Sequence, residues 1–217
     1  MKILLTSGAT REPLDDVRFL SNVSTGATGA ALADALAARG HAVTLLHGIG
    51  AVAPRRVRAM RSFGSTADLR AQLRALVATG GFDAVIQCSA VADYTPARVT
   101  RGKMSSDAPA LTLSLVPTPK VLPQIKSFAP GHGNRPPLVI GFKLTTGAGA
   151  AARAAAVAKL FAAGTVDAAI HNDMSELAAG RARPFRAYVA GRLRAKKLAG
   201  LPALAKWLDG FIRTARL

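Results

Sequence analysis

The sequence is poor in cysteine, in aromatic and acidic side chains, and in long apolar runs. Among its 217 residues there is one cysteine, Cys88, which excludes an internal disulfide framework and a cysteine zinc cluster. No stretch reaches the unbroken apolar length of a membrane span, and the N-terminus lacks the layout of a signal peptide. We therefore expect a cytoplasmic protein with no membrane partner.

Acidic residues are too few to balance the basic ones, because 29 Lys and Arg face 12 Asp and Glu and give a formal net charge of +17. Such an excess is one mark of proteins that bind nucleic-acid phosphates. It is densest from Arg181 onward, in RARPFRAYVAGRLRAKK, but no aromatic-interleaved basic stripe, helix-turn-helix or zinc signature accompanies it. We expect no nucleic-acid partner, and a basic nucleic-acid-binding module remains the weakest alternative.

What the chain does have is an N-terminal strand that runs into a glycine-rich loop. The apolar run Ile3–Leu5 breaks into Thr6-Ser7-Gly8, a polar loop spans Arg11–Ser24, and TGATG then leads into an alanine-rich helix over Ala30–Arg39. Free N–H groups at a helix N-terminus attract anions, and glycine lets the backbone approach a phosphate. The alternative is that the glycines only permit a turn and close packing of the helix on the strand.

Apolar periodicity predicts an α/β protein along the rest of the chain. We expect strands at Ala42–Leu46, Val57–Met60, Phe82–Cys88, Leu111–Val116, Leu138–Phe142 and Val166–Ile170, with Phe185–Ala190 pairing as a hairpin near Leu193. We expect helices at Thr66–Ala78, Val121–Phe128, Ala148–Ala163 and Leu201–Ile212, the last anchored by Trp207 and Phe211, and a mobile loop over Thr95–Ala110. The predicted fold is one domain over residues 1–217: a Rossmann-like, doubly wound, mostly parallel sheet in three αβα layers, with a flap loop and a small antiparallel excursion.

An NAD(P)-dependent oxidoreductase is the second function that such a fold allows. His47-Gly48 follows the second strand, where an acidic residue would hold the ribose of a dinucleotide. The G-x-G-x-x-G spacing and a Tyr-x-x-x-Lys pair are also missing. The sequence therefore disfavours this alternative.

Five segments together resemble the phosphopantothenate–cysteine ligases (phosphopantothenoylcysteine synthetases). TSGATREPLDDVRFLSNVSTGATG is similar to the opening of that family, except at Ala9, where a second glycine is usual. SAVADY after the fourth strand resembles the family's A-A-V-A/S-D-Y/F, and GKMSS resembles its flap motif K-I/M-x-S. FKLTT and the His171-Asn172-Asp173 segment match two later family motifs, the former in the version of stand-alone enzymes. His171 itself is interpreted as a packed residue at a strand end rather than as a base.

The resemblance implies a ligase of coenzyme A biosynthesis that joins 4′-phosphopantothenate and L-cysteine through an acyl-cytidylate and releases CMP and pyrophosphate. By position, it implies catalytic roles for Asn22 and Lys103. The residues that it implies for substrate binding are Arg18, Ser24, Thr25, Gly26, Gly29, Ala90 and Asp93. Those that it implies for nucleotide binding are Gly8, Thr10, Cys88, Ser89, Pro119, Lys120, Phe142, Lys143, Lys159 and Asn172.

The resemblance also implies partners and cofactors. We expect a homodimer, CTP or ATP as the nucleotide, Mg²⁺ carried by the triphosphate with no metal site of the protein's own, and no flavin, because the motifs begin at the first strand as in the stand-alone bacterial form. Cys88 is expected to be structural, since this chemistry needs no covalent nucleophile.

Overall fold

The computed structural model of the chain describes residues 1–107, 109–130, 135–176, 183–192 and 194–216. Its centre is an eight-stranded sheet with the strand order β12-β11-β10-β9-β6-β1-β4-β5. Six of these strands are parallel: β1 (Lys2–Ser7), β4 (Ala42–Gly48), β5 (Ala59–Phe63), β6 (Ala84–Gln87), β9 (Leu138–Thr145) and β10 (Ala168–Asp173). The last two, β11 (Pro184–Val189) and β12 (Lys196–Ala199), continue the sheet antiparallel.

The strand β1 lies at the point where the strand order of the sheet reverses. Its residues Ile3 to Ser7 are all buried, as expected for an apolar strand covered on both faces. It pairs in parallel with β4 on one side and with β6 on the other. Because the chain winds outward from β1 in both directions, the loops that follow β1 and β6 diverge and leave a crevice at their carboxyl ends.

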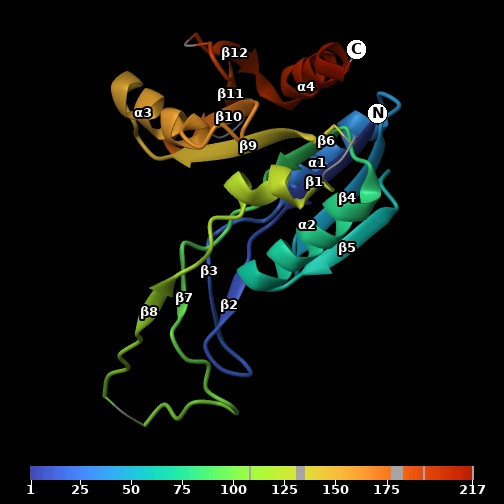
Figure 1. Ribbon diagram of the computed structural model, residues 1–217. Helices are drawn as coiled ribbons and strands as arrows, with labels where there is room; N and C mark the ends of the chain where they lie inside the picture. The colour runs from blue at the N-terminus through green and yellow to red at the C-terminus, as the bar shows by residue number, and fades with distance from the viewer. Residues whose placement is uncertain (108, 131–134, 177–182, 193, 217) are drawn as a thin grey trace.

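Helices cover both faces of the sheet (Figure 1). On one face, α1 (Ala27–Ala37) and α4 (Gly200–Arg216) pack their leucines against one apolar cluster. On the other face, α2 (Thr66–Gly80), the 3₁₀ helix η1 (Leu122–Phe128) and α3 (Ala150–Phe161) border a second cluster. This confirms the predicted three-layer α/β fold with a mostly parallel sheet.

Two short hairpins form an arm that projects from the sheet (Figure 1). One pairs β2 (Arg11–Pro13) with β3 (Phe19–Ser21), and the other pairs β7 (Tyr94–Pro96) with β8 (Leu115–Pro117). We refer to residues 11–21 and 94–117 together as the arm. It is the predicted antiparallel excursion, but it is larger than the sequence indicated, because the Arg11–Ser24 loop contains a hairpin of its own.

Several predicted boundaries were wrong. The expected strand Leu111–Val116 pairs only from Leu115, in β8, and the expected helix Val121–Phe128 is a 3₁₀ helix. The strand predicted at Val57–Met60 lies at β5, two residues later, and β10 runs through His171 to Asp173. The predicted hairpin after residue 184 is present as β11 and β12, whereas Leu193 lies outside the described residues.

In the C-terminal helix, Trp207 and Phe211 pack against the core as expected, but they are not its most buried residues. The buried residues of α4 include Leu204, Leu208 and Ile212. Trp207 and Phe211 are half-buried and stack on each other, with ring centroids 5.1 Å apart. Among the described residues, no helix has both the length and the apolar character needed to cross a membrane.

The close approach of α1 to β1 generates a prediction about Gly29. A Cβ at this position would lie 2.5 Å from Ser7 Oγ and 3.2 Å from Ser7 Cα. We expect Gly29→Ala to lower the free energy of unfolding by about 1–3 kcal/mol, because α1 must move away from the strand. Urea unfolding would measure this.

A matched control for that substitution is Gly210→Ala, since Gly210 also lies inside a helix and no atom lies within 4 Å of the added Cβ there. Equal stability of the two variants would show that the α1–β1 contact is not tight.

Candidate active site

A cleft of about 1000 Å³ opens at the carboxyl ends of the central strands. It lies at the place where the strand order reverses, between the loops after β1 and β6, and it extends to the ends of β9 and β10. This is where an open α/β sheet collects its ligands. Sixteen of the residues predicted from the sequence line it: Gly8, Asn22, Ser24, Thr25, Gly26, Gly29, Cys88, Ser89, Ala90, Asp93, Pro119, Lys120, Phe142, Lys143, Lys159 and Asn172.

The first wall of the cleft is the glycine-rich N-terminus of α1. Gly26 is the N-cap, with a φ of 76° that favours glycine. As a glycine it provides no side chain to cap the N–H groups of the first turn. The Gly26 carbonyl accepts a 2.8 Å hydrogen bond from Ser7 Oγ, which fixes the loop to the end of β1. The first-turn N–H groups of an 11-residue helix thus border the cleft and favour an anion there.

The second wall follows β6 and is held in place by two threonine hydroxyls. Thr6 Oγ1 accepts hydrogen bonds from the backbone N–H groups of Cys88 (3.2 Å) and Ser89 (3.1 Å). Thr10 Oγ1 accepts one from Ala92 N at 3.0 Å. Thr10, predicted to bind nucleotide, is buried and does not line the cleft, so that in this structure its hydroxyl shapes the wall from behind.

Asn22 connects the arm to this second wall. Its side-chain Nδ2 donates a 3.1 Å hydrogen bond to the carbonyl of Val91, and the residue is exposed at the cleft. Because an amide nitrogen carries two N–H groups, one donor remains for a bound ligand.

Asp93 and Lys120 form an ion pair at the edge of the cleft. Their side chains are 72% and 68% exposed, so that water screens the pair and either partner is free to turn to a charged ligand. Thr118 fixes the segment before Lys120, since its backbone N–H donates to Asp93 O at 3.0 Å and its hydroxyl donates to Ala92 O at 2.5 Å.

The third wall carries most of the positive charge. Lys143 lies on β9 and Lys159 on α3, and both line the cleft. Arg183, which the sequence did not single out, lies directly before β11 and also lines the cleft. Arg183 Nη1 lies 3.3 Å from Thr28 Oγ1 in the first turn of α1, across the cleft. With Lys120, four cations and a single carboxylate, Asp93, are found among the described lining residues, which makes the cleft suited to an anionic ligand.

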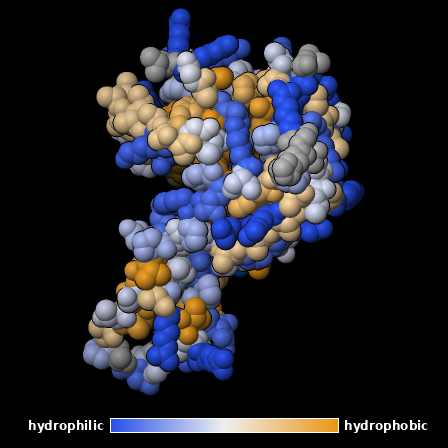
Figure 2. Space-filling model, in the orientation of Figure 1, coloured by the Kyte–Doolittle hydropathy of each residue, from blue (hydrophilic) through white to orange (hydrophobic). Residues whose placement is uncertain are grey.

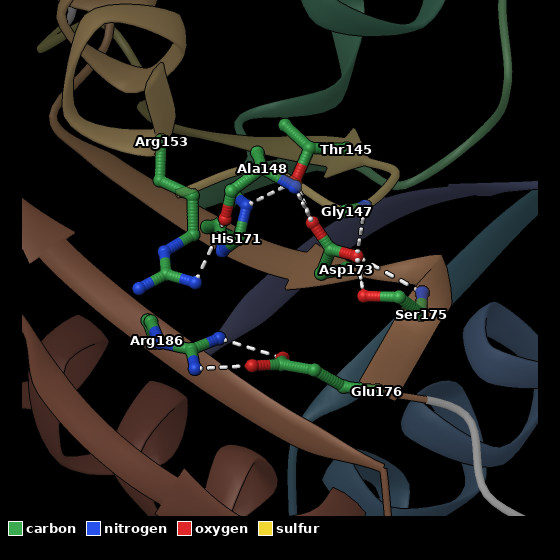
Figure 3. A network of polar contacts seen from close by, with 9 residues as sticks. All are labelled: Thr145, Gly147, Ala148, Arg153, His171, Asp173, Ser175, Glu176 and Arg186. Atoms are coloured by element: carbon green, nitrogen blue, oxygen red, sulfur yellow. Dashed lines mark hydrogen bonds and ion pairs between the residues drawn. The ribbon is translucent and has the colours of Figure 1, made fainter. Parts of the chain in front are cut away.

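A buried carboxylate, Asp173, organises this third wall (Figure 3). It accepts hydrogen bonds from Thr145 Oγ1 (2.5 Å), Gly147 N (2.8 Å), Ala148 N (3.1 Å) and both the N and Oγ of Ser175 (2.9 and 2.6 Å). These bonds, above all those from Ser175 and Thr145, hold the pKa of the Asp173 carboxyl well below its usual range. The carboxylate therefore connects the end of β9, the start of α3 and the short 3₁₀ helix η2 (Met174–Glu176).

His171 lies next to this carboxylate and is fully buried. Its Nε2 is 2.8 Å from Thr145 Oγ1, and since that hydroxyl donates to Asp173, the proton on His171 is assigned to Nε2 (Figure 3). Burial, with Arg186 and Arg153 nearby, lowers its pKa. His171 is thus neutral at pH 7 and packed, as the sequence suggested. Behind it, Arg186 forms a two-bond ion pair with Glu176.

Cys88 lines the cleft, but its thiol is not activated. Desolvation raises its pKa to about 12, so that the reactive thiolate is scarce at neutral pH. This favours the structural role expected for the cysteine.

Two of the predicted residues, Arg18 and Lys103, lie on the arm and do not line the cleft. Arg18 Nη1 forms a 3.0 Å ion pair with Asp15 and donates to Met104 O at 3.1 Å. Met104 N donates to Asp15 Oδ2 at 3.0 Å, and the N–H of Gly102 donates to Asp16 Oδ2 at 2.9 Å. The exposed Lys103 therefore sits between two residues that are fixed to the other hairpin of the same arm.

Arg183 was missed because no local signal marked it. Its place in the cleft depends on β11 returning antiparallel beside β10, a long-range pairing. The Asp173 network was missed for a similar reason, since its partners come from three separate elements.

Comparisons with known proteins show the family to which the chain belongs. The family model of the DNA/pantothenate metabolism flavoprotein C-terminal domain matches residues 1–189. The coenzyme A biosynthesis bifunctional proteins CoaBC of Thermococcus kodakarensis and Mycolicibacterium smegmatis are 32% and 37% identical to the chain, over 67% and 68% of it. The chain covers 34% and 36% of those proteins, about a third of the length of the curated relatives that it matches.

Solved structures share the fold over nearly the whole chain. The crystal structure of the DNA/pantothenate metabolism flavoprotein from Streptococcus pneumoniae has a TM-score of 0.86 at 25% identity and covers 99% of both chains. A mutant of Cab2 in complex with phosphopantothenate-cysteine has a TM-score of 0.71 at 17% identity, covering 100% of this chain and 89% of its own, which shows the fold alone.

The Asp173 network generates a prediction about pH. A carboxyl whose pKa is lower in the folded chain than in the unfolded one stabilises the fold above its unfolded pKa and loses that effect as the pH falls. We expect Asp173→Asn to lower the melting temperature at pH 7, and the difference from wild type to shrink as the pH falls below about 4, the unfolded pKa of an aspartate.

Melting curves between acidic and neutral pH would measure this, with Asp107→Asn, which changes an exposed carboxylate on the arm, as the control. A destabilisation by Asp173→Asn that does not change with pH would mean that the carboxylate charge is not what holds the loops.

Proposed function

Since the chain belongs to the family of the DNA/pantothenate metabolism flavoprotein C-terminal domain, we propose that it is a phosphopantothenate–cysteine ligase of coenzyme A biosynthesis. The observation that carries the proposal is the cleft at the strand switch point, where an asparagine amide, a helix N-terminus and four cations converge. Two relatives support it: the CoaBC proteins act in coenzyme A biosynthesis, and the Cab2 structure of the same fold is a complex with phosphopantothenate-cysteine.

The proposed reaction has two steps. A carboxylate oxygen of 4′-phosphopantothenate attacks the α-phosphorus of a nucleoside triphosphate, and the bond from phosphorus to the bridging oxygen breaks, so that pyrophosphate leaves and an acyl-nucleotide remains. The amine nitrogen of cysteine then attacks the acyl carbon. The carbon–oxygen bond to the nucleotide breaks, the nucleoside monophosphate leaves, and the amine loses its proton to water.

This chemistry needs positioning and charge neutralisation rather than an enzyme nucleophile. We assign the free N–H of Asn22 to the activated carbonyl, because Nδ2 is already oriented by its bond to Val91 O. Lys143, Lys159 and Arg183, with the N-terminus of α1, would neutralise the phosphates of the two substrates. Arg183 adds a bidentate donor that the sequence reasoning did not include.

We propose CTP as the nucleotide, as the family resemblance implies. ATP is the alternative, because groups that bind phosphates would serve both nucleotides. Among the described residues, no three His, Cys, Asp or Glu side chains gather to hold a metal, and Asp93 is the single carboxylate in the described lining of the cleft. Any Mg²⁺ would therefore enter with the triphosphate, where it would offset phosphate charge. We assign no flavin to the chain.

We propose that the protein is a homodimer, because the arm exposes apolar side chains that a second copy would cover. Two-stranded hairpins are marginally stable in water, yet the arm exposes apolar side chains on them. Hydrophobic patches are visible along the arm in the space-filling view (Figure 2). The exposed apolar side chains of the arm include Val17 (61% exposed), Phe19 (48%) and Val116 (41%). A second copy of the arm would cover them.

A dimer would also allow Lys103 to take part in catalysis. Its neighbours Gly102 and Met104 are bonded to Asp16 and Asp15 of its own arm, away from its own cleft. We propose that Lys103 acts in the cleft of the partner copy, where a cation on a flap would stabilise the charged transition state.

The first test is pyrophosphate release with phosphopantothenate, cysteine and each of the four nucleoside triphosphates. We expect release with CTP, and a loss of about a hundredfold in kcat for Asn22→Asp, since a carboxylate would repel the reacting anions. Release that requires no phosphopantothenate would contradict the ligase assignment.

A matched control is Gln72→Glu, which makes the same amide-to-carboxylate change on α2, away from the cleft, and loses the hydrogen bonds from Nε2 to Ser62 O and Asp68 Oδ1. It should retain wild-type turnover. Near-normal turnover of Asn22→Asp would remove Asn22 from the reaction.

The second test mixes two inactive variants, Asn22→Asp and Lys103→Gln. If Lys103 serves the partner's cleft, a mixed dimer contains one intact site, and exchange of subunits restores about a quarter of wild-type activity per chain. If Lys103 serves its own cleft, every site in the mixed dimer carries one substitution and no activity returns. Sedimentation of each variant alone would confirm that the dimer is still formed.

A further inference from the structure

A second groove, of about 720 Å³, lies between α4 and the β11–β12 hairpin. It shares no lining residue with the cleft, and in Figure 1 α4 and β12 stand at the end of the molecule opposite to the arm. All its lining residues except Val189 follow the range that the family model matches. The function proposed above makes no use of it.

The helix α4 lines this groove with a face that is only partly buried against the core. Ala203, Trp207, Gly210, Phe211 and Thr214 recur at helical spacing and line the groove. The buried face of the same helix is a different stripe, which includes Leu204, Leu208 and Ile212. The Leu204 stripe is thus fully buried, whereas the half-buried rings of Trp207 and Phe211 pack against the core and also line the groove.

Gly210 leaves open space where it lines the groove. No atom lies within 4 Å of a Cβ built on this residue, although glycine in the middle of a helix weakens it by roughly 1 kcal/mol relative to alanine. The stacked rings of Trp207 and Phe211, 7° from parallel, lie beside this opening. The groove therefore has room for a flat group next to an aromatic wall.

The rim of the groove is strongly basic. Arg192 lies in the hairpin turn, Lys196 and Lys197 on β12, and Lys206 on α4, and no acidic residue is among the described lining. Within the described part of the chain, none of the four forms an ion pair. The acid on α4, Asp209, is instead engaged by His41 (2.8 Å) and Arg213 (2.5 Å).

Edge protection explains only part of this charge. Lysines on an edge strand discourage pairing with another chain, which would account for Lys196 and Lys197. It does not account for Lys206 on the helix, or for the aromatic stripe and the open space at Gly210. An anion with an apolar planar part fits all of these features together.

We propose that this groove binds a free nucleotide, with its phosphates on the basic rim and its base against the Trp207–Phe211 wall. Lysine and arginine supply phosphate affinity, and aromatic side chains supply a surface for a base. The volume is that of a small-molecule site. A single nucleoside triphosphate is the occupant to which the proposal commits, and this binding is independent of the ligase reaction.

The test uses the fact that Trp207 is the only tryptophan of the protein. Its fluorescence, corrected for nucleotide absorbance, reports occupancy of the groove and not of the cleft. We expect ATP or CTP to change it saturably, and added salt to weaken binding. Lys196→Gln with Lys197→Gln should weaken binding at least tenfold, whereas Arg58→Gln with Arg74→Gln removes two exposed charges elsewhere and should not.

A second variant, Gly210→Leu, fills the open space while favouring the helix. It should abolish the fluorescence response and retain or raise the melting temperature. The proposal is overturned if no nucleotide changes the fluorescence, if the groove variants bind as the control does, or if single-stranded oligonucleotides bind and free nucleotides do not. Because pyrophosphate release is not measured, failure here leaves the ligase proposal untouched.

Discussion

The position of β1 in the middle of the sheet is the constraint on which the cleft depends. Because β1 pairs with β4 on one side and β6 on the other, the loops after β1 and β6 must leave in different directions. Two hydroxyls near the end of β1, those of Thr6 and Thr10, then capture backbone N–H groups of the loop after β6. The crevice is thus bordered by rigid walls before any ligand enters, which lowers the cost of ordering it.

The sequence predicted the parts of the site that depend on local pattern. An apolar run ending in small residues identified β1, and the glycines with the following helix identified the anion-binding wall, because both signals lie within a few residues. The second wall followed from the strand before Cys88 in the same way. The arm was underestimated because its strands are three residues long and exposed, and the β2–β3 turn is stabilised by Asp15, whose carboxylate accepts from Val17 N and Arg18 N.

What could not be predicted depends on contacts between distant segments. Arg183 enters the cleft only because β11 pairs antiparallel with β10. Asp173 was placed in a family motif, but its role in joining three elements is visible only when Thr145 and Ser175 are brought to it. Thr10 shows the converse, since it follows the right strand but its hydroxyl points to the protein interior. Sequence therefore located the residues that line the cleft locally, and the pairing of strands decided which distant side chains reach it.

The scarcity of acidic residues leaves much of the positive charge of the molecule uncompensated. Many of its carboxylates accept hydrogen bonds from backbone N–H groups, where they hold turns and strand ends in place: Glu12, Asp15, Asp16, Asp34, Asp68, Asp83, Asp167 and Asp173. A carboxylate used in this way is partly satisfied by backbone N–H groups, although Asp15 and Asp167 also form ion pairs with Arg18 and Lys126. The cations of the cleft and of the second groove are therefore left largely without counter-charges from the described residues. Such an imbalance destabilises a compact chain by self-repulsion, which a bound polyanion relieves. We propose that ligand phosphates supply part of the counter-charge for the net charge of +17, at the four cations of the cleft and the four of the second groove.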